Sequence, residues 1–279
     1  MYQNILVATD GSDIATTAAD QGISIAKKFD ATIHAVSVVE GDGTDGQADD
    51  EARSRHRQFV ETVEEKAVDR DVSVGTSIQT GQPSRELLEY ADEHDIDLCV
   101  LGTHGRTGIR RWIMGSVARA VVREARCPVL TVNPSVTDVA HDIDDICIAT
   151  DGRPGVEAAV ENGLDLAEAY GSTVHSLYVV DDVHSHMDIV LDALEEIGER
   201  STNTIANRAA ERGLETKRAI ERGIPNEAIG SYAADHDIDI VVVGTESRSG
   251  LDRLVTGSVS QRVVSSSPVP VLSVRTLEQ

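Results

Sequence analysis

The sequence predicts an α/β fold made of two tandem, doubly wound, five-stranded parallel sheets. Short aliphatic runs such as 5–8 alternate with segments whose apolar residues recur at helical spacing. The runs at 98–101 and 240–243 are apolar without interruption, as expected for parallel strands that are covered on both faces. Strands that alternate with helices also imply right-handed crossovers. The whole pattern occurs twice, so each half is expected to form such a sheet.

The 279-residue chain is a tandem duplication. Thr9-Asp10-Gly11 returns as Thr150-Asp151-Gly152, and the run His94-Asp-Ile-Asp97 returns at 236–239. Each copy is the size of a typical domain and long enough to bury its own core. We therefore expect one domain over 1–134 and a second over 143–279, joined by a polar linker at 135–142.

The expected elements follow in order along each copy. The first copy has predicted strands at 5–8, 32–39, 72–78, 97–101 and 129–132, with helices at 15–26, 51–69, 84–94 and 116–124. Ser12 or Asp13 is expected to cap the first helix, and the polar stretch 41–50 to form a surface loop. The second copy has predicted strands at 146–150, 173–180, 215–220, 240–243 and 271–274, with helices at 155–170, 188–212, 225–236 and 258–265.

A glycine-rich loop follows the apolar run 98–101. Gly102 and Gly105 are separated by two residues, and Gly115-Ser116 comes nine residues later, at the start of a helical pattern. Glycines let a backbone approach a phosphate, and a helix N-terminus offers free N–H donors and a favourable dipole. This spacing favours a phosphate site, with turn geometry and a helix cap as the plain alternative.

Asp10 ends the first predicted strand, and Gly102 ends the fourth. In a doubly wound sheet, ligands bind beyond the carboxyl ends of the strands, where the winding reverses. If these two strands are neighbours, a carboxylate suited to sugar hydroxyls meets a phosphate-binding loop at one crevice.

The composition limits the partners. The net charge of −23 argues against nucleic acid, whose phosphates would be repelled. An acidic chain with lysine at only four positions suits a protein dissolved in concentrated salt, so a halophilic source is expected. Cys99, Cys127 and Cys147 are expected to be buried, reduced thiols. Without a basic leader or a long apolar run, we expect a cytoplasmic protein that contacts no membrane.

These residues resemble the universal stress protein family, in its ATP-binding branch, over both halves. Its Gly-x2-Gly-x9-Gly-[Ser/Thr] motif is matched in full by Gly102, Gly105, Gly115 and Ser116. The resemblance implies a Rossmann-like or flavodoxin-like fold, of the adenine nucleotide α-hydrolase-like type, with strand order 3-2-1-4-5. It also implies ATP, with Mg²⁺ or Mn²⁺ on its phosphates. Asp10 would hold the ribose and Val38 the adenine, with further contacts from Thr9, Thr103, Arg106 and Val117.

The second half departs from that motif. Ser247 stands where the second glycine belongs, and Glu246 replaces His104. A serine restricts the backbone, and a carboxylate repels phosphate, so we expect the second site to bind ATP more weakly or not at all. The residues that the resemblance assigns to this site are Asp151, Val179, Gly244, Arg248, Gly257, Ser258 and Val259.

The resemblance implies a sensor or regulator of a stress response rather than an enzyme. No catalytic residue is assigned, because no base for water is evident; slow ATP hydrolysis and a nucleotide-free, dimerising interaction protein are the alternatives. The apolar last strands, 129–132 and 271–274, are expected to be covered by pairing of the two halves, with a homodimer as a further option. His184-Ser-His186 is expected to be a polar loop rather than a metal site.

Overall fold

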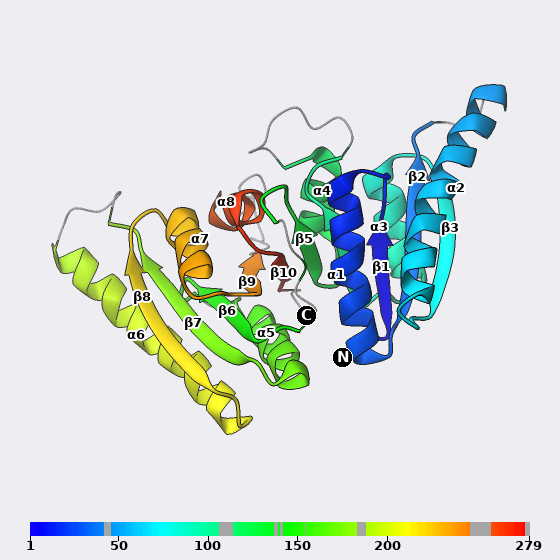
Figure 1. Ribbon diagram of the computed structural model, residues 1–279. Helices are drawn as coiled ribbons and strands as arrows, with labels where there is room; N and C mark the ends of the chain where they lie inside the picture. The colour runs from blue at the N-terminus through cyan, green and yellow to red at the C-terminus, as the bar shows by residue number, and fades with distance from the viewer. Residues whose placement is uncertain are drawn as a thin grey trace. The chain divides into compact units, whose positions relative to one another are not determined.

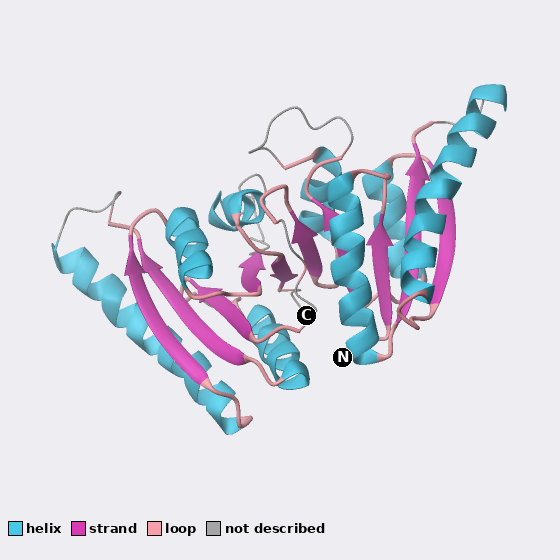
Figure 2. Cartoon of the chain, viewed as in Figure 1, coloured by secondary structure: helices cyan, strands magenta, loops and turns pink. Residues whose placement is uncertain are grey.

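The computed structural model describes residues 1–41, 46–105, 114–136, 139, 142–153, 155–182, 188–245 and 258–276. The chain divides into two compact units, Met1–His141 and Asp142–Gln279. Each unit is a parallel sheet with helices on both faces, which confirms the predicted fold class (Figures 1 and 2). The exact limits of the linker stay a prediction. In the described part of the chain, no helix is long and apolar enough to cross a membrane.

In the first unit, the sheet has the strand order β3-β2-β1-β4-β5, and all neighbours are parallel. This is the expected 3-2-1-4-5 order. The elements are β1 (Asn4–Ala8), α1 (Asp13–Phe29), β2 (Thr32–Val39), α2 (Gly46–Val68), β3 (Val74–Thr80), α3 (Pro83–Glu93), β4 (Leu98–Gly102), α4 (Ser116–Glu124) and β5 (Val129–Val132).

The second unit repeats this order as β8-β7-β6-β9-β10, again with parallel neighbours. Its elements are β6 (Asp145–Thr150), α5 (Glu157–Tyr170), β7 (Thr173–Val180), α6 (Asp188–Glu211), β8 (Thr216–Arg222), α7 (Pro225–Asp235), β9 (Ile240–Thr245), α8 (Ser258–Ser266) and β10 (Val271–Arg275).

The core of each unit lies between the central strands and the helices. In the first unit, α1 packs on β1 and β4, α2 packs on β2 and β3, and α3 lies beside α4 (Figure 1). The strand interiors are fully buried, for example at Ile5, Val7 and Val100. A strand buried on both faces needs apolar residues at consecutive positions, which is why the aliphatic runs identify these strands.

Helix starts and ends follow local chemistry. Ser12 caps α1, because its hydroxyl accepts a hydrogen bond from the Ala15 N–H at 3.2 Å. The predicted loop at 41–50 is partly wrong, because α2 already begins at Gly46. After Gly46 the sequence has no glycine or proline before Gly75, so no residue in that stretch breaks the helix. Helix α5 starts two residues later than expected, since Gly155 takes a left-handed conformation with φ +109°.

Candidate functional site

The predicted site lies at the carboxyl edge of the first sheet, where the winding reverses. Strands β1 and β4 are direct neighbours, with Val7 opposite Val100, so both end at the same edge. The strands that lead to Asp10 and Gly102 are therefore neighbours, as the predicted site required. In a doubly wound sheet this is the position at which ligands bind.

Asp10 is half-buried in the turn that follows β1. Its Oδ1 accepts a hydrogen bond from the Ser12 N–H at 3.0 Å. Its Oδ2 faces the glycine loop, because a Cβ added to Gly105 would lie 2.7 Å from that oxygen. The carboxylate thus lies close to the loop and leaves no room for a side chain at 105, although Asp10 and Gly105 are 95 positions apart in the sequence.

The three motif glycines each have a reason within the protein itself. A Cβ on Gly102 would lie 2.8 Å from the Ile14 Cγ2 on α1, and a Cβ on Gly115 would lie 3.1 Å from the Thr103 carbonyl oxygen. The Gly115 N–H also donates to that carbonyl at 2.8 Å. The glycine spacing is therefore explained by close packing of the loop, and its role toward a ligand stays a prediction.

Helix α4 begins directly after Gly115, which is its N-cap. Glycine has no side chain that could accept a hydrogen bond from the first turn, and Ser116 is exposed while Val117 is half-buried. The free N–H groups and the dipole at this end favour an anion. The carboxyl edge of the sheet thus carries an acid, Asp10, and a helix N-terminus that favours an anion.

Thr103 and His104 lie inside the protein. The Thr103 hydroxyl and the His104 Nδ1 form a 2.9 Å hydrogen bond, and the Thr103 N–H donates to the Val132 carbonyl at 2.8 Å. His104 is only 6% exposed, which favours a structural role. Thr9 is also buried, and Val38 lies near the end of β2 at 9% exposure. Their assignment to a ligand stays a prediction.

The corresponding edge of the second unit differs in its acid. Asp151 is exposed, its Oδ1 accepts a hydrogen bond from the Arg153 N–H at 3.1 Å, and its Oδ2 lies 3.7 Å from the Arg153 Nε. Burial raises the pKa of the nearby Tyr178 hydroxyl, and the Asp151 charge adds to that effect. A Cβ on Gly244 would make only an ordinary contact, 3.4 Å from Val156.

The remaining predicted residues of this unit are only partly described. Val179 is half-buried on β7, and Val259 is 37% exposed on α8. Ser258 begins α8. Residues outside the described part of the chain are Arg106, His184, His186, Glu246, Ser247, Arg248 and Gly257.

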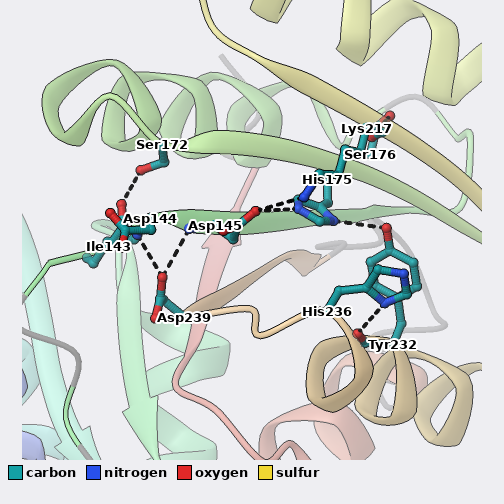
Figure 3. Close-up of polar contacts among 10 residues, drawn as sticks. All are labelled: Ile143, Asp144, Asp145, Ser172, His175, Ser176, Lys217, Tyr232, His236 and Asp239. Atoms are coloured by element: carbon teal, nitrogen blue, oxygen red, sulfur yellow. Dashed lines mark hydrogen bonds and ion pairs between the residues drawn. The ribbon is translucent and has the colours of Figure 1, made fainter.

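A duplicated polar network, which the sequence did not predict, lies at the opposite edge of each sheet. In the second unit the His175 Nδ1 lies 2.9 Å from the Tyr232 hydroxyl, and its Nε2 lies 2.7 Å from Asp145 Oδ1 (Figure 3). The His236 ring stacks on Tyr232 with 3.9 Å between centroids. Asp239 accepts two hydrogen bonds, from the N–H groups of residues 144 and 145.

The first unit has the same network with one change. His34 contacts the Tyr90 hydroxyl at 3.1 Å, but its Nε2 meets Asn4 Oδ1 at 3.3 Å instead of a carboxylate. Burial lowers the pKa of both His34 and His175, and the hydrogen bond to Asp145 opposes that effect only at His175. The recurring run His-Asp-Ile-Asp was the sequence signal for this network, because it supplies His94 and Asp97 and their second-unit counterparts.

Comparisons with known proteins agree on one family. The model of the universal stress protein family matches residues 1–133 and 143–275. A universal stress protein of Methanocaldococcus jannaschii is 35% identical over 140 residues, which cover 47% of this chain and 82% of that protein. A universal stress protein of Mycobacterium tuberculosis is 26% identical over 293 residues, which cover 97% and 96%.

The fold is also found among solved structures. The crystal structure of a universal stress protein from Archaeoglobus fulgidus superposes with a TM-score of 0.75 at 18% identity, and the match covers 98% of each chain. At this identity the likeness concerns the fold alone.

Proposed function

This chain belongs to the universal stress protein family, and we propose that its first unit binds an adenine nucleotide, ATP, at the edge where Asp10 meets Gly105. The closeness of the Asp10 Oδ2 to position 105, in the loop that leads to the N-terminus of α4, is the observation that supports this proposal most directly. The bound state would serve as the signal of a stress-response regulator.

The charges at this edge fit the parts of a nucleotide in one orientation. A carboxylate accepts hydrogen bonds from sugar hydroxyls and repels phosphates, so Asp10 suits the ribose. The first-turn N–H groups of α4 suit the phosphates. The family resemblance implies that the base meets the backbone near Val38, at the end of β2. In bound ATP, these N–H donors and a divalent cation would offset the negative charge of the triphosphate.

The described residues offer no separate metal site. No group of three or more His, Cys, Asp or Glu side chains among them is arranged to hold an ion. As the family resemblance implies, a Mg²⁺ or Mn²⁺ ion would bind through the phosphates of the nucleotide.

We expect the second unit to bind nucleotide more weakly. Asp151 is exposed and already paired with Arg153, whereas Asp10 is half-buried and faces its loop. A ribose would compete with the Arg153 side chain for the Asp151 carboxylate, and that competition reduces the net gain from binding.

The first experiment measures nucleotide in the purified protein. The protein is denatured, and the released small molecules are identified and counted by chromatography and mass spectrometry, followed by titration with ATP and Mg²⁺. We expect about one strong site per chain. Asp10→Asn should weaken binding at least about tenfold, equivalent to about 1.4 kcal/mol. The matched variant Asp151→Asn should change it by less than about twofold.

Three outcomes would change the proposal. Equal losses in the two variants would contradict the ranking of the sites, and no binding at all would favour a nucleotide-free interaction protein. Release of phosphate from bound ATP that stops in Asp10→Asn would favour a slow ATPase. Replacing Gly115 by a bulky residue is a poorer test, because its Cβ would meet the Thr103 carbonyl even without a ligand.

The assembly and the setting are separate proposals. We propose that the two halves pair through their last strands; light scattering would show whether the chain is a monomer or a homodimer. The charge of −23 supports the proposal that the protein does not bind nucleic acid. It also supports the proposal that the protein works in a salt-rich cytoplasm.

A further inference from the structure

Two of the three cysteines meet in the first unit. Cys99 lies in β4, and Cys127 lies just before β5, with 3.5 Å between their sulfur atoms. Residue 99 stands opposite Val129 in the β4–β5 ladder, and its N–H donates to the Pro128 carbonyl at 3.0 Å. This main-chain hydrogen bond holds the two side chains beside each other.

The two thiols differ in environment. Cys99 is 1% exposed, whereas Cys127 is half-buried. The expectation of three buried thiols is therefore wrong for Cys127, because it sits in the loop before its strand rather than within it. The hydrogen bond between the sulfurs lowers the pKa of Cys127 and raises that of Cys99, while burial opposes the effect at Cys127. Cys127 is thus the thiol that ionises more readily and that solvent can reach.

We propose that Cys99 and Cys127 form an oxidant-sensitive thiol pair, which peroxide converts to a reversible disulfide within the first unit. The sulfurs need to approach from 3.5 Å to about 2.05 Å, a small movement for two side chains already in contact. This proposal does not depend on nucleotide binding.

The chemistry proceeds in two balanced steps. Cys127 first loses its proton to solvent, and its thiolate attacks one oxygen of hydrogen peroxide. The O–O bond breaks, the sulfur becomes a sulfenic acid, and the leaving hydroxide takes up the proton that Cys127 released, which gives the first water. The Cys99 sulfur then attacks the Cys127 sulfur, the S–O bond breaks, and the leaving hydroxide takes the Cys99 proton. Two thiols are oxidised, and one peroxide is reduced to two waters.

Simple packing is the alternative explanation, because buried cysteine behaves as a small apolar residue. The second unit places Val241 and Val269 at the equivalent positions. Its backbone is the same, since the Val241 N–H donates to the Pro270 carbonyl at 3.1 Å. The fold therefore accepts valine at both positions. Replacing each cysteine by valine is thus a substitution that removes the thiol and that the second unit already contains. The proposed bond would close a covalent ring over 99–127, which contains the whole glycine loop.

The test uses the full chain, reduced and then treated with hydrogen peroxide. After denaturation, free thiols are alkylated and the protein is analysed by mass spectrometry. We expect two of the three thiols to escape alkylation. A pair of peptides joined through Cys99 and Cys127 should appear, with the mass of two hydrogen atoms lost. Dithiothreitol should restore all three thiols.

The controls are single variants. Cys99→Val and Cys127→Val should form no disulfide within the chain, whereas Cys147→Val should form it as the natural protein does. Burial raises the pKa of Cys147 to about 12, so it is expected to stay reduced. Three intact thiols after peroxide, a Cys127 sulfinic acid without the joined peptides, or a disulfide that involves Cys147 or a second chain would each overturn the proposal.

Discussion

Asp10 and Asp151 come from the same repeated tripeptide, yet they lie in different surroundings. Two positions after Asp10 comes Ser12, which caps α1. Two positions after Asp151 comes Arg153, which pairs with the carboxylate. The sequence predicted a weaker second site from residues 246 and 247. The structure adds a separate reason to expect this, the pairing of Asp151 with Arg153. That pairing depends on the direction of a side chain, which the sequence does not show.

The histidine networks carry a prediction at the same scale. His175 is fully buried, and its hydrogen bond to Asp145 partly offsets the lowering of its pKa by burial. We expect Asp145→Asn to lower the pKa of His175 further, since the carboxylate is lost and Lys217 remains nearby. Titration of the histidine ring protons by NMR measures this. In the first unit, Asn4→Asp should have the opposite effect and raise the pKa of His34.

The pH dependence of stability follows from the direction of these shifts. A histidine whose pKa is lowered by folding binds protons more readily in the unfolded chain. Its contribution is complete above the unfolded value of about 6.5 and is lost as pH falls toward the folded pKa. Asp145→Asn should make this loss of stability at acid pH steeper. A variant whose His175 pKa rises, or whose acid unfolding is unchanged, would contradict this account of the network.

Two helical glycines give a prediction at the scale of elements. A Cβ on Gly163 of α5 would lie 2.8 Å from the Cδ1 of the buried Ile148 on β6. Among the described residues, a Cβ on Gly230 of α7 would come within 4 Å of Pro268 alone, at 3.8 Å. Alanine is favoured over glycine within a helix by about 0.5–1 kcal/mol. We expect Gly230→Ala to stabilise the protein by about that amount. Gly163→Ala should destabilise it, because the new methyl group would overlap the buried Ile148 side chain, and either that side chain or the helix must shift.

Thermal or urea unfolding of both variants tests this difference. Equal stabilisation would show that α5 does not approach β6 as closely as described. The same contact shows why the elements were predictable and the distances between them were not. Alternation of apolar runs identifies the strands and helices, but only packing shows which glycine lies against a neighbour. Gly102 is a further case, since its closeness to Ile14 on α1 is not visible in the motif.

Element boundaries show the same limit. Strands such as β2 and β7 agree with the sequence because apolar runs end at polar turns. The start of α2 was misplaced because glycines at 41, 43 and 46 indicated a loop, although a helix can begin at the last of them. Contacts between distant residues, such as Cys99 with Cys127 or Asp10 with Gly105, required the sheet order, which the sequence supplied only through the family resemblance.

At the scale of the whole molecule, the charge dominates. The chain has 48 acidic residues against 25 lysines and arginines. Ion pairs use part of this excess: Asp20 holds Lys66 and Arg70 at 2.9 and 3.0 Å, and Arg212 contacts Asp165 and Glu168 at 2.6 and 3.6 Å. The acids that remain repel one another, and salt screens that repulsion, since the Debye length falls from about 10 Å at 0.1 M to about 3 Å at 1 M.

We therefore expect the melting temperature to rise with potassium chloride. This expectation assumes that salt weakens the repulsion among the excess acids more than the attraction within the pairs. The rise between about 0.1 M and 1 M salt should then reach at least about 4 °C, equivalent to about 1 kcal/mol. Arg212→Gln is the matched control: it removes the centre of one ion-pair group, so it should lower the melting temperature most in dilute salt. A melting temperature that falls as salt is added would mean that the ion pairs outweigh the repulsion, and the acidic surface would then need another explanation than adaptation to salt.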